Sequence, residues 1–371
     1  MAHLIKAERD ITPDDEALAA DHCLSKATDV QTSGRRIHLN TKACLTRLES
    51  WPSLYPEEVV TLVLFAVTII VNVVVHHTLN ASILFATVHT YRTIFAAFVM
   101  DFFRALGYCL MAYGAWQFLQ FIAGRPVDLV VWRRTGKLWT AARALVVYWL
   151  CNMAFLNLDS FVHVLSPLDR DAWLIAVDKA LFFGHHPLKL LEPLVAWASV
   201  RFFAQVYFTL YLVPLVAMII FLHQAKLRAF HDTILSLAFA VAIGWPIYLL
   251  VPAIGPYYVQ RDLFSWDMWN VAGTLQEGTD RLSRATFPSL HTGISVTVLI
   301  LVWRHSPSPL FRITFTLWVA GIVFSTMYLR LHYVIDVIAG IGLAILVAYL
   351  GPRVNDWYLA TDSPEGCHNS C

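Results

Sequence analysis

Long apolar runs with few or no charges constrain the fold of this chain more than any other feature. The runs Val59–Val75 and Ala105–Ala123 contain no charged residue and have the length of a helix that crosses a bilayer. Six more predicted spans follow, with Arg143 and Asp336 as their only Asp, Glu, Lys or Arg residues: Leu138–Leu158, Phe202–Leu222, Thr233–Val251, Ser289–Trp303, Ile313–Leu329 and Tyr333–Leu350. Only 14% of the residues are charged, against about 25% in an average soluble domain. The sequence predicts an all-α, polytopic membrane protein with about eight transmembrane helices.

The distribution of charge divides the chain into four parts. Residues 1–57 are polar and mixed in charge, which predicts a soluble N-terminal tail, and residues 352–371 form a short C-terminal tail. Residues 58–137 hold two additional transmembrane helices and a basic loop, and residues 138–351 hold a core of six helices. The segment Asp171–Gly184 places Trp173, Leu174, Val177, Ala180 and Leu181 on one helical face, which predicts a helix lying on the membrane surface.

Several classes of function are disfavoured by composition. The net charge of +1 predicts no nucleic-acid partner. The six cysteines form no Cys-x-x-Cys pair, so we expect neither a disulfide framework nor a zinc site. The histidine pairs His76-His77 and His185-His186 have no accompanying set of carboxylates, and adjacent side chains on a helix diverge. We therefore expect no metal and no cofactor.

Two motifs place histidines at the ends of predicted spans. The stretch Ala285–Thr292 contains Pro288, which suits the first turn of a helix, and His291, which then lies beside free backbone N–H groups that attract anions. In the stretch Ser325–Gly340, His332 and Asp336 are four residues apart and so share one helical face. A carboxylate beside an imidazole fixes its tautomer and supports positive charge on the ring.

Each motif alone has a structural explanation. His332 and Asp336 can be a polar pair that helps a helix pack, and His291 can face lipid headgroups at a helix start. Together, the motifs lie at one depth on one side of the predicted membrane. Two histidines, a carboxylate and a helix N-terminus are groups suited to phosphoryl transfer without a metal.

These residues resemble a known family. Phe287-Pro-Ser-Leu-His-Thr and Ser325-x6-His332-x3-Asp336 are similar to the second and third signature motifs of the type-2 phosphatidic acid phosphatase superfamily. The pattern from Thr326 to Asp336 resembles its inositolphosphotransferase branch, which includes the inositol phosphorylceramide synthases. The segment from Asp178 to Pro187 and the loop Gly255-Pro-Tyr-Tyr resemble the same branch, so the resemblance covers roughly residues 138–351.

The resemblance implies a phosphohistidine mechanism. His332 would attack phosphorus with Asp336 orienting it, and His291 would protonate the leaving oxygen and later deprotonate the acceptor. The chain lacks the Lys-x6-Arg-Pro motif of the phosphatases and has Thr326 where they carry an arginine. Phosphate binding therefore needs other groups. Arg330 is the main candidate, with a headgroup anchor as the alternative, and the others are Ser289, Tyr257, Tyr258, Lys179 and Arg261.

The sequence thus predicts a membrane enzyme that uses membrane lipids as donor and acceptor. The favoured hypothesis is a transferase that moves a headgroup such as inositol phosphate to a lipid alcohol. A lipid phosphate phosphatase and a catalytically idle transporter or scaffold are the alternatives. Basic residues are denser in the loops 124–137, 223–230 and 304–312 than in the loops that bear the motifs. By the positive-inside rule, the site should open to the extracytoplasmic or lumenal side.

Overall fold

The structure is a computed structural model that describes residues 54–78, 137–224, 226–264, 284–306 and 308–362, with isolated positions between 107 and 122. Within these residues the regular elements are helices only, and the one isolated β-bridge joins Ala253 to Ala285. The all-α prediction is confirmed. The predicted N-terminal tail, the run Ala105–Ala123 and the basic loop lie almost entirely outside the described residues. The predicted domain bounds stay predictions.

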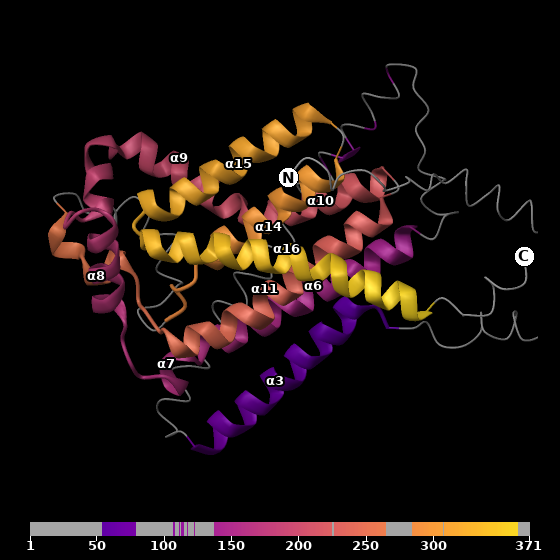
Figure 1. The fold of residues 1–371 in the computed structure, drawn as a ribbon, viewed down its shortest axis with the longest axis horizontal. Helices are drawn as coiled ribbons and strands as arrows, with labels where there is room; N and C mark the ends of the chain where they lie inside the picture. The colour runs from indigo at the N-terminus through magenta and orange to yellow at the C-terminus, as the bar shows by residue number, and fades with distance from the viewer. Residues whose placement is uncertain are drawn as a thin grey trace, which may run out of the picture. The chain divides into compact units, whose positions relative to one another are not determined.

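The described elements follow one another in a simple order (Figure 1). The long helices are α3 (Pro56–Thr78), α6 (Lys137–Ser160), α9 (Trp197–Phe208), α10 (Leu212–His223), α11 (Leu227–Leu250), α14 (Leu290–His305), α15 (Pro309–Tyr328) and α16 (Val334–Asp362). Shorter elements connect them: α7 (Val162–Leu165), α8 (Asp171–Leu181), α12 (Pro256–Val259) and the 3₁₀ turns η2 (Pro187–Leu194), η3 (Thr209–Tyr211) and η4 (Arg261–Leu263).

Five stretches within the described residues are long and apolar enough to cross a membrane. They are Pro56–Val75, Trp197–His223, Leu227–Leu250, Pro309–Tyr328 and Val334–Leu359. Each overlaps a predicted span, which supports a membrane protein. Helices α6 and α14 also form where spans were predicted, but they are not among the five. The predicted number of about eight spans stays a prediction.

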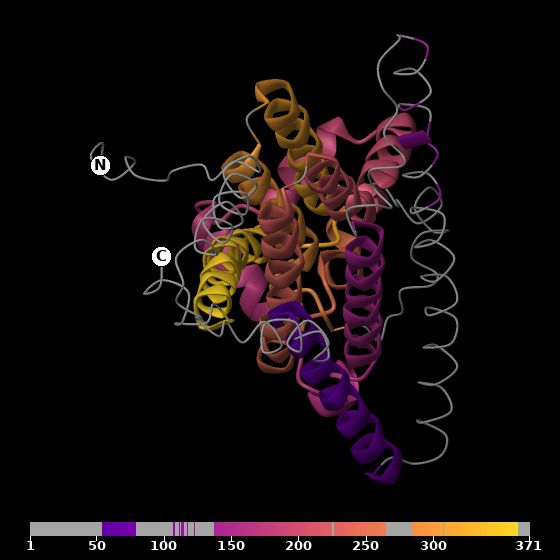
Figure 2. The same ribbon diagram turned by 90° about the vertical axis from the view of Figure 1, so that its right-hand side faces the viewer.

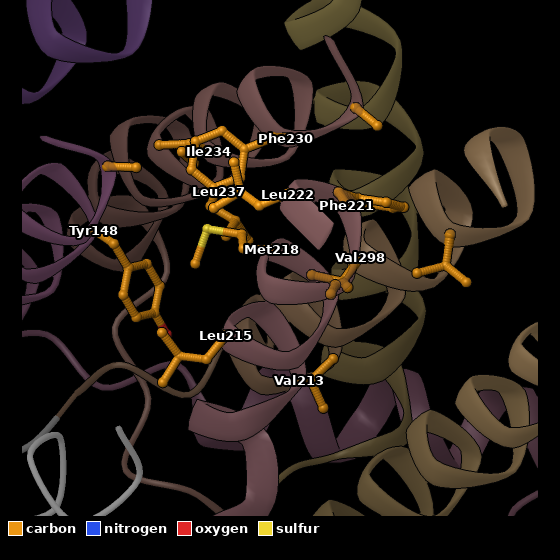
Figure 3. Packing of buried hydrophobic residues seen from close by; sticks show 14 of the residues in the cluster. Tyr148, Val213, Leu215, Met218, Phe221, Leu222, Phe230, Ile234, Leu237 and Val298 are labelled. Atoms are coloured by element: carbon orange, nitrogen blue, oxygen red, sulfur yellow. The ribbon is translucent and has the colours of Figure 1, made fainter. Parts of the chain in front are cut away.

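The central apolar cluster joins helices α6, α10, α11, α14 and α15. Figure 3 shows part of it, with Met218 and Leu222 of α10 beside Ile234 and Leu237 of α11. Phe221, Val298 and Val302 are fully buried in the same cluster. Lipid cannot drive helices together as water does, so this close packing is what holds the bundle.

Helix α3 packs against α6 and α11 (Figure 2). Polar side-chain contacts also join it to both helices. Arg143 of α6 makes two hydrogen bonds to the Glu58 carboxylate, at 2.8 and 2.5 Å. His231 of α11 contacts Glu57 at 2.6 Å. The charge of Arg143 thus has a partner on the neighbouring helix.

Two predicted spans differ in detail from the observed helices. The span Phe202–Leu222 is interrupted by η3, which ends three residues before Pro214, because a proline clashes with the carbonyl four residues earlier. The last helix continues to Asp362, well past the predicted end at Leu350. Arg353 and Asp356 end the apolar run but not the helix, and Asp356 pairs with Arg228 of α11.

Candidate active site

The second signature motif, Phe287-Pro-Ser-Leu-His-Thr, leads into α14 through a turn. Hydrogen bonds join this turn to the loop before α12. The Thr286 hydroxyl donates to the Ala253 carbonyl at 2.7 Å, and the Ala253 N–H donates to the Arg284 carbonyl at 3.1 Å. Ser289 then caps α14, since its hydroxyl accepts from the Thr292 N–H at 3.3 Å. Pro288 precedes the helix, so its expected place in the first turn is wrong. His291 is the second helical residue, so it does lie in the first turn.

The third signature motif, Ser325-x6-His332-x3-Asp336, contains a tight turn at the end of α15. The Leu331 N–H donates to the Thr326 carbonyl and the Arg330 N–H donates to the Met327 carbonyl, both at 2.9 Å, which is the Schellman arrangement. Arg330 occupies the position after the helix end that glycine usually occupies in this arrangement, because its φ is positive, at +62°. A left-handed arginine costs about 1 kcal/mol or more, and such strain gathers at functional sites. Its guanidinium is buried and lies 3.6 Å from the Phe264 ring centroid.

His332 lies two residues before α16, and one hydrogen bond indicates the tautomer of its ring. Nδ1 is 3.0 Å from the Thr286 carbonyl oxygen, and Oδ2 of Asp336 lies 3.6 Å from the same nitrogen. A carbonyl can only accept a hydrogen bond, so the contact with Thr286 places the proton on Nδ1 and the lone pair on Nε2. Burial lowers the pKa of His332 to about 4, although the bond to Thr286 acts in the opposite direction. At neutral pH His332 is therefore an uncharged imidazole.

His291 faces His332 from the start of α14. The two ring centroids are 5.6 Å apart and the planes are tilted by 55°. The His291 ring also stacks on Tyr207 of α9, with centroids 4.4 Å apart and an interplanar angle of 22°. The two imidazoles are thus close enough to reach one phosphoryl group, while only His332 has a carboxylate beside it.

The two motifs are joined backbone to backbone. The Ser289 N–H donates to the Asp336 carbonyl oxygen at 3.0 Å. Farther along α16, a Cβ added to Gly340 would lie 2.5 Å from the Ser289 carbonyl oxygen, so only glycine allows the two helices to come this close. The distance between the histidines is therefore set by main-chain packing, which is more rigid than side-chain contact.

The sequence reasoning missed two carboxylates on α8 that hold these segments in place. Asp178 accepts from the Val334 and Ile335 N–H groups, at 2.9 and 2.8 Å, and so caps α16 from a distant helix. Figure 1 shows α8 beside the end at which α15 gives way to α16. Burial raises the pKa of Asp178, and its two hydrogen bonds act in the opposite direction.

Asp171 makes the second set of contacts from α8. Its carboxylate accepts from the Ile254 and Gly255 N–H groups, each at 2.8 Å, and from the Tyr333 hydroxyl at 2.7 Å. Gly255 has φ at +107°, and an added Cβ would lie 3.0 Å from the Leu331 carbonyl oxygen. Asp171 therefore holds the Gly255-Pro-Tyr-Tyr loop against the third motif.

The spacing of Asp171 and Asp178 in the sequence was the signal that could have revealed these contacts. Asp171, Leu174 and Asp178 lie three and four residues apart on one helical face, and each is at most 3% exposed. The predicted helix exists, but this mixed face packs on the protein, while Trp173 and Leu181 are about half exposed. Carboxylates at that spacing inside an otherwise amphipathic segment indicate partners in the protein.

The other predicted substrate-binding residues have varied environments. Ser289 is fully buried as the cap of α14, and Tyr257 is buried in a cluster with Tyr328 and Leu329. Tyr258 packs edge-on against Tyr257 at 5.1 Å, and Arg261 is exposed on η4. Lys179 lies on α8 near His186, whose pKa is lowered by burial and by the charges of Lys179 and Lys189. Their roles in binding stay predictions.

Comparison with known proteins gives one match. A family model described as PAP2 superfamily matches residues 172–350, a segment that contains both histidine motifs in full and all of α8 except for Asp171. No curated protein matches the chain, and no solved structure does. The match covers most of the predicted six-helix part but does not distinguish the inositolphosphotransferase branch. It supports placing residues 172–350 in the PAP2 superfamily, whose members are typically phosphatases or phosphotransferases.

Proposed function

We propose that this protein is a membrane phosphotransferase that acts on lipid phosphoesters through a covalent phosphohistidine on His332. The observation that carries the proposal is the environment of Nδ1 in that residue. The Thr286 carbonyl accepts a hydrogen bond from Nδ1 at 3.0 Å, with Asp336 Oδ2 3.6 Å away, which leaves the Nε2 lone pair available for attack. The ring centroid of His291 lies 5.6 Å from that of His332, close enough to reach the same phosphoryl group. His291 has no carboxylate partner among its described contacts, which suits a proton-transfer role.

The reaction proceeds in two displacements. In the first, Nε2 of His332 bonds to phosphorus, the bond to the lipid oxygen breaks, and His291 gives that oxygen a proton. The headgroup phosphate is then attached to His332 and the first lipid leaves as an alcohol. In the second, His291 takes the proton of an acceptor hydroxyl, whose oxygen attacks phosphorus. The P–N bond breaks and His332 is restored.

Transfer to a lipid alcohol is favoured over hydrolysis by the groups around the site. Thr326 stands where the phosphatases have an arginine, and it is fully buried with its hydroxyl donating to the Val323 carbonyl. That position therefore supplies no charge to a phosphoryl group, and the buried Arg330 is the candidate instead. The buried aromatic residues Tyr257 and Tyr328 favour an apolar acceptor over bulk water.

The test follows a labelled headgroup. Purified protein is incubated with a headgroup-labelled inositol phospholipid and with ceramide or diacylglycerol as acceptor. The proposal expects label in a second lipid, with free headgroup phosphate as a minor product. Release of free phosphate whatever alcohol is supplied would show a lipid phosphatase. Absence of turnover with every donor would favour the idle transporter or scaffold.

We also propose that the site opens away from the cytosol. The basis is the density of basic residues in the loops 124–137, 223–230 and 304–312. A cysteine at Ser265, in the loop before the second motif, should react with an impermeant thiol reagent from outside or from the lumen. A cysteine at the exposed Gln224, at the other end of the bundle, should not react. The reverse labelling pattern would contradict this topology.

A further inference from the structure

We propose that Tyr207 is the positioning residue that allows His291 to act first as an acid and then as a base. This inference rests on the proposed function, because it concerns the proton that both displacements move. The Tyr207 hydroxyl is 3.4 Å from Nδ1 of His291, and the two rings are stacked with centroids 4.4 Å apart. Tyr207 thus contacts His291 both through its ring and through its hydroxyl.

The hydroxyl suits a histidine that must change its protonation state. A phenol donates to the Nδ1 lone pair of a neutral imidazole, and it accepts from the Nδ1–H of an imidazolium. It therefore remains a partner in both states. A carboxylate in place of the phenol would stabilise the charged imidazolium. A carbonyl in its place would keep a proton on Nδ1 in both protonation states of the ring.

His332 provides the contrast within the same site. Its Nδ1 is hydrogen-bonded to the Thr286 carbonyl, which can only accept, with Asp336 Oδ2 3.6 Å away. His332 is thus held in the tautomer of a nucleophile, while His291 has a partner that can donate or accept. The difference between these partners agrees with the two proposed roles.

The position of Tyr207 is fixed by the packing of α9 on α15. Phe203, one turn earlier, packs against both Phe324 and Tyr328, with centroids 4.9 and 4.8 Å away. Two residues after Tyr207, α9 gives way to η3 at Thr209, whose hydroxyl accepts from the Trp318 indole at 2.7 Å. Contacts on both sides of Tyr207 hold its ring against His291, as a residue that orients a catalytic group requires.

The experiment compares two leaving groups in Tyr207→Phe. One donor is the lipid phosphoester, whose alkoxide must be protonated as it leaves. The other is the 4-nitrophenyl ester of the same headgroup phosphate, whose phenolate leaves without a proton. The measurement is the single-turnover rate at which the leaving group is released, because it reports only the first displacement. The phenylalanine ring keeps the stack, and a thermal melt confirms that the variant folds.

We expect release of the lipid to slow about tenfold in Tyr207→Phe, while the donor concentration that gives half the maximal single-turnover rate stays within a factor of two. Release of nitrophenolate should stay within a factor of two of the unchanged protein. Tyr148→Phe is the control, since Tyr148 is a buried tyrosine in the central apolar cluster on α6. It should leave both rates unchanged.

Other outcomes overturn the proposal. Equal slowing of both donors would mean that Tyr207 only supports the fold, and unchanged rates with both would mean that its hydroxyl has no role. Failure of the proposed transferase function is seen separately, because water as sole acceptor still gives a first displacement in which Tyr207 is tested. A protein that cleaves neither donor refutes both proposals.

Discussion

Replacing Gly340 by alanine should damage catalysis more than it damages the fold. The added Cβ would lie 2.5 Å from the Ser289 carbonyl oxygen and 3.1 Å from Cβ of Thr292, both on α14. Real Cβ contacts are essentially never shorter than 3.0 Å, so α14 and α16 must part by about 0.5 Å or more. That movement separates His291 from His332 and stretches the hydrogen bond from Ser289 to Asp336.

Two opposing contributions to the free energy of unfolding set the expected change in stability. Overpacking a close contact costs about 1–3 kcal/mol, while alanine in place of a helical glycine returns about 0.8–1 kcal/mol. The net loss of stability should be about 0–2 kcal/mol. A displacement of about 1 Å can reduce turnover about a hundredfold, so half of that should reduce kcat about tenfold.

The assay is kcat for headgroup transfer together with a thermal melt in detergent. The control is Gly342→Ala on the same helix, where an added Cβ meets nothing within 4 Å. It should leave kcat unchanged and keep the melting temperature or raise it slightly. Wild-type kcat in Gly340→Ala would refute the claim that this crossing sets the distance between the histidines.

Three further predictions follow from the site. Asp178→Ala removes two hydrogen bonds to a charged acceptor and should cost about 2–4 kcal/mol, with Asp178→Asn recovering about half; an unchanged melting temperature would exclude the cap. Since the pKa of His332 is about 4, protonation of this ring should cause no loss of kcat/KM between neutral pH and pH 5, and such a loss should begin only near pH 4. The unfolded chain, with a histidine pKa near 6.5, binds the proton more readily, so the contribution of His332 to stability should decline between pH 6.5 and 4. An acidic limb in kcat/KM near pH 6.5 would contradict the burial of this ring. Activity should survive a chelator, and loss with rescue by one divalent ion would refute a metal-free reaction.

Hydropathy predicted the helices of this chain well because each long apolar run must bury its backbone hydrogen bonds inside one helix. It placed the start of α15 within four residues and that of α14 within one. It failed at the end of α16, since the charged residues Arg353 and Asp356 signal an exit from the membrane but not the end of a helix. Hydropathy measures the cost of burying side chains in lipid. It therefore indicates where the chain leaves the bilayer, while the helix itself can continue past that point.

The histidines and Asp336 were predictable because they are close in sequence or carry a recognisable spacing. Asp178 was not, because its partners Val334 and Ile335 are more than 150 residues away and are backbone groups, which leave no trace in the side-chain pattern. Tyr207 was missed for another reason. A tyrosine in an apolar span is most often a side chain that faces lipid or headgroups, and only the fold brings it against His291.

The most direct test of the central claim is to trap the covalent intermediate. Protein mixed with a headgroup-labelled donor in the absence of acceptor is quenched within one turnover, kept at alkaline pH and digested for mass spectrometry. The account predicts headgroup phosphate on His332, with none in His332→Ala. Full turnover by His332→Ala, or stable label on any other side chain, would contradict it.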